Sequence, residues 1–171
     1  MNGSNRAGHG SGRMAELYNT RLLRLAASIP CTMRLDAPDA TATLHSPLCG
    51  SRITVEIVLN GDRVTGYGQE VRACLVGQAA ASVLGSLIVG LTVAEFRRGH
   101  ALFRTMLRDR TPPPAGLWHP LEALAPVADV PVRHRSALLP FDAVEAALAR
   151  VAGLDGCNDP PSLFRSSEGC S

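Results

Sequence analysis

Residues 52–72 have the sequence RITVEIVLNGDRVTGYGQEVR, which predicts two antiparallel β-strands joined by a tight turn. From Arg52 to Leu59 apolar residues mostly alternate with polar or charged ones, as in a strand with one buried face. Asn60-Gly61-Asp62 follows, and Asn and Gly adopt the positive φ angles of a hairpin turn at low cost. Residues 63–72 return as the second strand of this hairpin.

A further strand precedes the hairpin, and helices lie before and after this sheet. Residues 34–46 predict an extended segment, and a turn at residues 46–50 leads from it into the hairpin. The stretch 75–89 is too long and too apolar for a strand and predicts a buried helix. This order predicts an α+β sandwich, a three-stranded antiparallel meander with helices on one face. The predicted helices are residues 14–28, 75–89, 92–107, 118–124 and 132–151.

Two positions within the helices carry more specific expectations. Thr92 with Glu95 predicts a capping box, in which each side chain bonds a free backbone N–H of the other residue. Pro140 lies inside the last helix and has no N–H, so it predicts a kink and leaves the Ser136 carbonyl without its usual partner.

The composition predicts one globular domain with a tail at each end. Of 171 residues, 46% are hydrophobic and 19% charged, which is typical of a folded protein. Gly-, Ser- and Asn-rich residues 1–13 predict a disordered N-terminal tail, and residues 154–171 predict a flexible C-terminal tail. The domain is therefore expected at residues 14–153. Because Cys157 and Cys170 fall in the second tail, they are set aside as site residues.

Charge and hydropathy favour a soluble cytoplasmic protein that binds neither nucleic acid nor membrane. The net charge of +2 is too small to argue for nucleic acid. No apolar run is long enough to cross a bilayer, and no signal-peptide core is present. The five cysteines are odd in number and widely spaced, which argues against a disulfide framework.

Two cysteines are expected to meet in the fold. Cys49 lies in the turn before the second strand, and Cys74 lies where the third strand gives way to a helix. In a meander these two positions share one end of the sheet. The helix N-terminus stabilises a thiolate at Cys74, and a pair of thiolates suits a soft metal or a cluster. The alternative is that both cysteines only fill space, as buried free cysteines usually do.

Three segments together resemble the NifU/IscU-type iron–sulfur cluster assembly scaffolds. They are Ser46-Pro47-Leu48-Cys49-Gly50, Ala73-Cys74 with the Ala-rich helix after it, and Arg133-His134-Arg135-Ser136-Ala137. The resemblance covers residues 14–153 and implies a SufE/NifU-like sandwich. Residues 103–106, FRTM, lie in a long segment that is similar to the insertion of the SufU branch.

The resemblance also implies a set of ligands. The family has a cysteine at each motif and an aspartate two residues after the first, and these groups bind zinc or a nascent cluster. Cys49 and Cys74 match, whereas Ser51 replaces the aspartate and Ser136 the third cysteine. The implied metal site is therefore Cys49, Cys74 and Ser136, two thiolates and a hydroxyl, for a transient iron–sulfur cluster or zinc.

Other side chains are open as additional ligands. His134 is near Ser136 in sequence but points roughly 200° away from it on a helix. His45 precedes Cys49 on a strand, and Cys31 follows the first helix; each has a simpler interpretation as a surface or core residue. Arg133 and Arg135 flank Ser136 and would favour thiolates electrostatically, or belong to an ordinary solvated helix face.

Three functions remain open at this point. The first is a scaffold that holds a labile cluster, alone or shared in a homodimer, and passes it to apo iron–sulfur proteins. The second is a zinc-dependent, SufU-like sulfur acceptor for a cysteine desulfurase. The third is a degenerate member that binds partner proteins without metal. A non-enzymatic scaffold or carrier is favoured over an enzyme, because the sequence has no hydrolytic triad or phosphate-binding loop.

Overall fold

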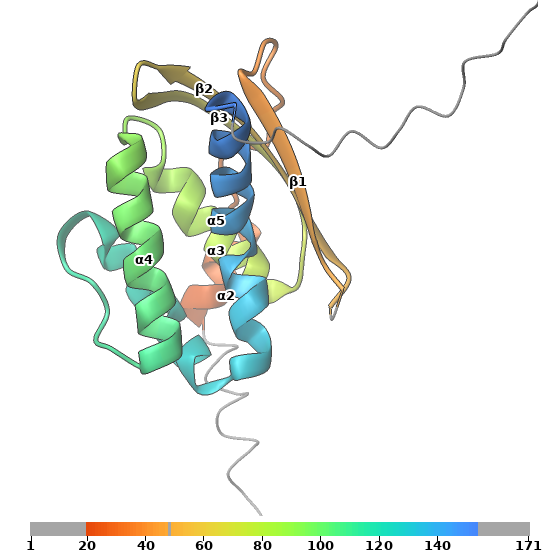
Figure 1. Cartoon of the computed structure of the whole chain (residues 1–171). Coiled ribbons are helices and arrows are strands. Elements are labelled where there is room, and N and C mark those ends of the chain that lie inside the picture. Colours follow the sequence, from red (N-terminus) through yellow and green to blue (C-terminus); the bar gives the residue numbers. More distant parts are fainter. Residues whose placement is uncertain (1–19, 48, 154–171) are drawn as a thin grey trace, which may run out of the picture.

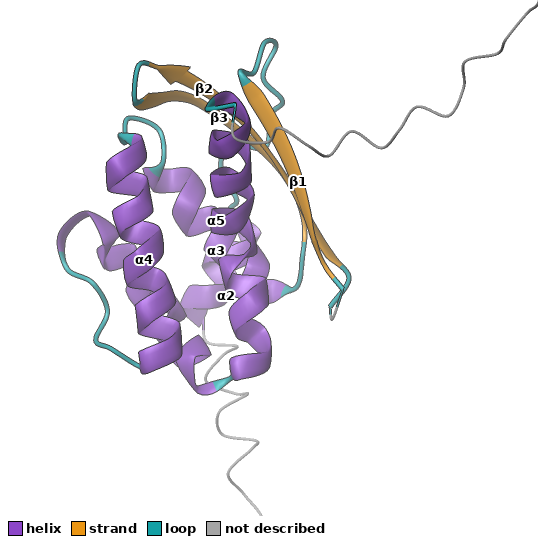
Figure 2. Cartoon of the chain, in the orientation of Figure 1, coloured by secondary structure: helices purple, strands orange, loops and turns teal. Residues whose placement is uncertain are grey.

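A computed structural model describes residues 20–47 and 49–153 of the chain. Its three strands form one antiparallel sheet in the order β1-β2-β3, as the sequence predicts. The helices pack on one face of this sheet (Figures 1 and 2), so the expected α+β sandwich is confirmed. The strands are β1 (Ala40–Ser46), β2 (Ser51–Asn60) and β3 (Arg63–Arg72).

The hairpin of β2 and β3 forms as its turn sequence predicts. Asn60 pairs with Arg63 across the turn, and Gly61 takes a φ of 63°, in the left-handed region that glycine tolerates. The side chains of Ile53, Val55 and Ile57 are fully buried against the helices. Burial of this one face fixes the register, because a slip of one residue would turn these side chains to solvent.

The first strand begins later than expected. Residues 34–39 were predicted to be extended, but β1 starts at Ala40. The backbone N–H of Leu35 donates to the Glu56 carboxylate at 2.7 Å instead of pairing with a strand, and Arg34 forms an ion pair with the same carboxylate at 2.8 Å. This segment passes close to Gly68 of β3, where a Cβ would lie 2.7 Å from the Met33 carbonyl.

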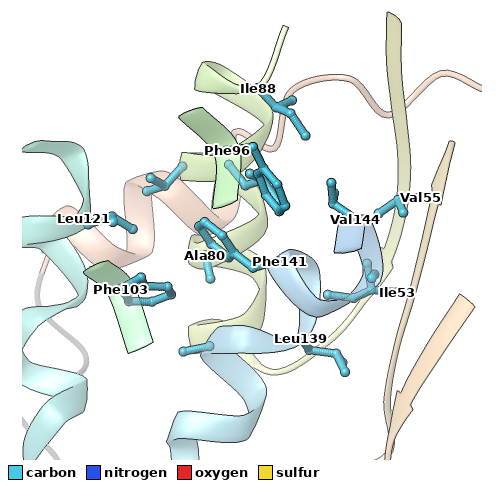
Figure 3. Packing of buried hydrophobic residues seen from close by; sticks show 14 of the residues in the cluster. Ile53, Val55, Ala80, Ile88, Phe96, Phe103, Leu121, Leu139, Phe141 and Val144 are labelled. Carbon is cyan, nitrogen blue, oxygen red and sulfur yellow. The ribbon is translucent and has the colours of Figure 1, made fainter. Parts of the chain in front are cut away.

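The helices enclose a core that the sheet closes from one side. Figure 3 shows Phe96, Phe103 and Phe141 packed among helix side chains, with Ile53 and Val55 facing them from β2. Of the expected first helix, only α2 lies within the described residues; the segment before it and both expected tails lie outside them. The helices are α2 (Thr20–Ala27), α3 (Leu75–Leu87), α4 (Val93–Asp109), the 3₁₀ helix η1 (Gly116–Asp129) and α5 (Pro131–Val151).

Helices α3 and α4 match their sequence signals. Most of α3 is buried, and its small residues allow close packing; a Cβ at Gly77 would lie 3.3 Å from the Ser136 carbonyl of α5. The capping box of α4 is present, since Thr92 accepts from the Glu95 N–H and Glu95 accepts from the Thr92 N–H. No helix in the described part of the chain is long and apolar enough to cross a membrane.

The last two helices differ in detail from expectation. The short helix expected at residues 118–124 is longer, because η1 spans Gly116–Asp129 as a 3₁₀ helix that includes Pro120 and Pro126. Helix α5 is continuous from Pro131 to Val151 with Pro140 inside it, and the kink expected at Pro140 stays a prediction. In Figure 1, α5 begins near the end of the sheet that carries the turn from β1 to β2, and it runs to the opposite end of the molecule.

Candidate functional site

The turn between β1 and β2 carries the first thiol. Ser46 and Ser51 are cross-strand partners, so only four residues, 47–50, join the two strands. Gly50 takes a φ of 66°, which lets the chain turn back into β2 directly after Cys49. Both serine side chains belong to the buried face of the sheet, with exposed fractions of 1% and 2%. Their hydroxyls therefore lie beneath the Cys49 turn instead of in solvent.

Serine hydroxyls from two elements converge on Cys49. Its Sγ lies 2.9 Å from Ser51 Oγ and 3.2 Å from Ser136 Oγ, on α5. Ser136 is only 2% exposed, so its hydroxyl has little water to bond. Ser46 Oγ is also buried and makes no hydrogen bond of ordinary geometry, although it is near enough to stabilise a charge on Cys49. The site is thus a thiol among three buried hydroxyls.

This surrounding favours the charged form of Cys49. Burial alone would raise the pKa of the thiol, but hydrogen bonds from Ser136, Ser46 and Ser51, including the Ser51 backbone, outweigh it and lower the pKa from 9.0 to about 6. At neutral pH the side chain is therefore mostly thiolate, by about ten to one. A thiolate is both the nucleophilic form of cysteine and the form that binds metals.

The backbone of the second cysteine, Cys74, adjoins the first through Ser51. Cys74 is the N-cap of α3, with no side-chain hydrogen bond to the helix, and its backbone N–H donates to Ser51 Oγ at 3.4 Å. Ser51 accepts this bond and can donate its own proton to the Cys49 thiolate. The structure thus brings Cys49, Cys74 and Ser136 together at one end of the sheet, as expected, with Ser51 between the two cysteines.

The other candidate ligands lie elsewhere. His134 Nε2 is 3.1 Å from the Val127 carbonyl oxygen and 3.2 Å from that of Ala128, so its ring faces η1. His45 is exposed and alternates with the buried Ser46, which places it on the outer face of the sheet. Cys31 Sγ contacts the Gly85 carbonyl at 3.6 Å, near the C-terminal end of α3, whereas Cys74 is at the N-terminal end. Neither histidine, nor Cys31, joins the thiol pair.

The described residues do not supply a closed metal cage. Within residues 20–47 and 49–153, no three His, Cys, Asp or Glu side chains are grouped so that they could hold a metal ion. A structural zinc site needs four good ligands, and a serine hydroxyl keeps its proton near neutral pH. Two thiols with hydroxyls around them do not fit resident zinc.

One residue of the site escaped the sequence analysis. The sequence places Ser46 at the start of the turn and of the first family-like segment but gives it no role in the site, yet its hydroxyl contributes to the low pKa of Cys49. The signal that could have found it is the strand register, which pairs Ser46 with Ser51. Arg133 and Arg135, expected to flank the site, lie in the first turns of α5, the former half-buried and the latter exposed.

Known structures and sequences place the chain in a family. The crystal structure of the N-terminal part of a NifU-like protein from Brucella abortus is 36% identical, covers 82% of this chain and 98% of its own, and superposes with a TM-score of 0.79. The chain belongs to the NifU/IscU-type family. No protein-family model matches it.

Two curated sequences of the NifU/IscU-type family are more distant. The zinc-dependent sulfurtransferase SufU of Bacillus subtilis is 27% identical over 110 residues, which are 64% of this chain and 75% of SufU. The iron–sulfur cluster assembly scaffold protein IscU of Streptococcus pyogenes is 24% identical over 126 residues, 74% of this chain and 79% of IscU. The resemblance to the family is confirmed, while the assignment to its SufU branch stays a prediction.

Proposed function

We propose that this chain is an iron–sulfur cluster assembly scaffold that binds iron or a labile cluster through Cys49 and Cys74, with Ser136 at the third ligand position. Membership of the NifU/IscU-type family supports the scaffold function. The observation that carries the site is the shared hydroxyl of Ser51, which contacts both the Cys49 sulfur and the Cys74 backbone. The cluster is cargo here, because a scaffold must release what it assembles.

A site with few thiolate ligands suits a protein that passes its cluster on to another protein. A stable cluster is held by four thiolate-like ligands, and this site offers two among the described residues. Incomplete ligation leaves coordination positions for a second copy of the chain or for an incoming recipient protein. The partners of this function are a cysteine desulfurase that supplies sulfur and apo proteins that accept the cluster, and a homodimer would supply four thiolates from two chains.

Metal and sulfide analysis tests the proposal. The protein is purified without oxygen, and iron, zinc and acid-labile sulfide per chain are measured before and after reconstitution. We expect iron and sulfide in the wild type and their loss in a Cys49→Ala/Cys74→Ala double variant. Cys31→Ala is the matched control, since it removes a thiol near the other end of α3 and should keep the iron and sulfide. Wild-type protein without iron and sulfide would overturn the proposal.

A second function is favoured by the hydroxyls around Cys49. They stabilise a thiolate on a half-exposed side chain, which is what a sulfur acceptor needs. In such a transfer the thiolate attacks the outer sulfur of a persulfide on the donor enzyme. A new S–S bond forms at Cys49, the S–S bond of the donor breaks, and the donor leaves as a thiolate. The step needs no oxidant, and the described residues do not favour the zinc ion on which SufU depends.

Mass spectrometry separates the two functions. After incubation with a cysteine desulfurase and cysteine, a sulfur acceptor gains one sulfur atom on the peptide that contains Cys49. Zinc without sulfide in the purified protein would instead support the zinc-dependent version. A protein that takes up neither metal nor sulfur would leave the third alternative, a family member that only binds partner proteins.

A further inference from the structure

Sulfur that arrives as a persulfide differs in oxidation level from the sulfur of a cluster. A cluster contains sulfide, whereas the outer sulfur of a persulfide needs two more electrons before it leaves as sulfide. A second thiol supplies these electrons when it attacks the inner sulfur, because the product of that attack is a disulfide. A site that accepts sulfur for a cluster therefore gains a further activity if a second thiol lies beside the acceptor.

Two contacts hold the Cys49 sulfur at the N-terminus of α3, where Cys74 lies. The first is Ser51, whose Oγ is 2.9 Å from Cys49 Sγ and 3.4 Å from the Cys74 nitrogen, so this sulfur and this nitrogen are at most 6.3 Å apart. The second is Ser136. Its Oγ is 3.2 Å from the same sulfur, and its carbonyl oxygen would lie 3.3 Å from a Cβ at Gly77, in the first turn of α3.

Both cysteines are placed so that their sulfurs can meet. A disulfide joins residues whose Cα atoms are about 4.4–6.8 Å apart, which is compatible with this separation. Cys74 is half-buried and makes no side-chain cap bond to α3, so its side chain turns toward Cys49 without breaking one. Cys49 is half-exposed and lies in the turn between β1 and β2, where a small movement does not disturb the hydrogen bonds of the sheet.

No other thiol in the described part of the chain competes with Cys74. Cys31 contacts Gly85, eleven residues along α3 from Cys74, and a helix of that length spans about 16 Å. Ser136 touches the Cys49 sulfur, but a hydroxyl does not form an S–S bond. A persulfide on Cys49 therefore has a single thiol, that of Cys74, as its neighbour among residues 20–47 and 49–153.

We propose that Cys74 resolves a persulfide on Cys49 and releases its outer sulfur as sulfide. The Cys74 thiolate attacks Cys49 Sγ, and a bond forms between the two Sγ atoms. The bond from Cys49 Sγ to the outer sulfur breaks, and this sulfur leaves as HS⁻ with the proton that it carried in the persulfide. The outer sulfur is reduced and the two cysteines are oxidised to a disulfide, so the step uses no outside reductant.

This step also defines the reaction that must follow it. A dithiol of another protein has to reduce the Cys49–Cys74 disulfide by thiol–disulfide exchange before the next sulfur is accepted. That reduction returns both thiols, which are then again available as ligands for iron or a cluster. The inference rests on the sulfur-acceptor function proposed above and gives that acceptor a product, sulfide, that a cluster can incorporate directly.

A single turnover tests the release of sulfide. A cysteine desulfurase is incubated with cysteine, freed of it by gel filtration so that only the enzyme's persulfide remains, and mixed without oxygen with the metal-free protein. We expect about one sulfide for each sulfur that the desulfurase loses. Trypsin cleaves after arginine and places Cys49 on peptide 35–52 and Cys74 on peptide 73–97, so mass spectrometry should find these two peptides joined by a disulfide within one chain.

Matched variants assign the step to Cys74. Cys74→Ser should accumulate the Cys49 persulfide and release roughly tenfold less sulfide than the wild type. Serine is a favoured N-cap residue, so α3 is expected to form in this variant. Cys31→Ser is the control and should release as much sulfide as the wild type.

The outcomes separate this inference from the function on which it rests. A wild type that keeps its persulfide, or a Cys74→Ser variant that releases as much sulfide as the wild type, overturns the role of Cys74 and leaves sulfur acceptance by Cys49 in place. A wild type that neither gains sulfur nor releases sulfide overturns the sulfur-acceptor function and this step with it.

Discussion

Ser136 shows how one atom changes the chemistry of a site. A cysteine at this position would offer a soft, readily ionised ligand, whereas the serine hydroxyl stays protonated and donates a hydrogen bond. In this chain the acceptor of that bond is the sulfur of Cys49, 3.2 Å away. Oxygen in place of sulfur at this position therefore lowers the affinity of the site for a soft metal. The same hydroxyl stabilises the thiolate form of Cys49.

The pH dependence of alkylation measures this effect at a single residue. Iodoacetamide reacts with the thiolate, so the labelling rate of Cys49 should rise with pH through a midpoint of about 6. Ser136→Ala removes a donor that stabilises the anion, so the pKa must rise, and the midpoint is expected to move upward by roughly one pH unit. Labelling is followed on the tryptic peptide that contains Cys49.

A serine outside the site provides the control. Ser86→Ala removes a hydroxyl that bonds the Val83 carbonyl within its own helix, and it should leave the midpoint unchanged. Ser51→Ala should act like Ser136→Ala, because its hydroxyl is the other neighbour of the sulfur at 2.9 Å. A midpoint near 9 in the wild type, or one that neither substitution moves, would show that the hydroxyls do not stabilise the thiolate.

At the scale of elements, the site depends on how closely the helices approach one another. Ser136 sits on α5, whose position is set by α3, by the sheet and by α4. Small residues mark the close approaches, and Gly99 of α4 is the tightest: a Cβ there would lie 1.9 Å from the Trp118 ring of η1. Trp118 in turn lies against Phe141 of α5, with ring centroids 6.2 Å apart. A change at Gly99 therefore bears on the helix that carries Ser136.

Gly99→Ala is expected to destabilise the protein even though it improves helix propensity. Alanine in a helix interior gains roughly 0.5–1 kcal/mol over glycine, but overpacking against a buried ring costs about 1–3 kcal/mol. Urea unfolding should therefore show a lower free energy of unfolding. In the double variant Gly99→Ala/Trp118→Leu the clash is removed, so its cost should be smaller than the sum of the two single costs. A stabilised Gly99→Ala variant would contradict this packing.

For the whole molecule, the sequence predicts the fold better than the site. Alternation in β2 and β3 and the Asn-Gly turn are local signals, so the meander follows from them directly. The start of β1 does not, because it depends on the distant Glu56 carboxylate that binds the Leu35 N–H. The three-hydroxyl surrounding of Cys49 also depends on long-range contact: Ser136 is 87 residues away in sequence, and only the packing of α5 on the sheet brings it there.

The domain boundary that the sequence predicts at Gly153 gives the last prediction. The buried core of the described residues ends at Leu148, and Val151, Ala152 and Gly153 are exposed. A chain shortened to residues 1–153 should therefore unfold in one cooperative transition, with a Tm within about 2 °C of the full-length protein when both are free of metal. Calorimetry measures the Tm of each.

The same shortened chain separates folding from cargo binding. Since it keeps Cys49, Cys74 and Ser136, it should retain as much iron and sulfide after reconstitution as the full-length protein. A large fall in Tm would instead mean that residues 154–171 contribute to the stability of the fold, and loss of metal would then reflect unfolding. Equal Tm with equal loading is the combination expected if residues 1–153 contain both the fold and the thiol site.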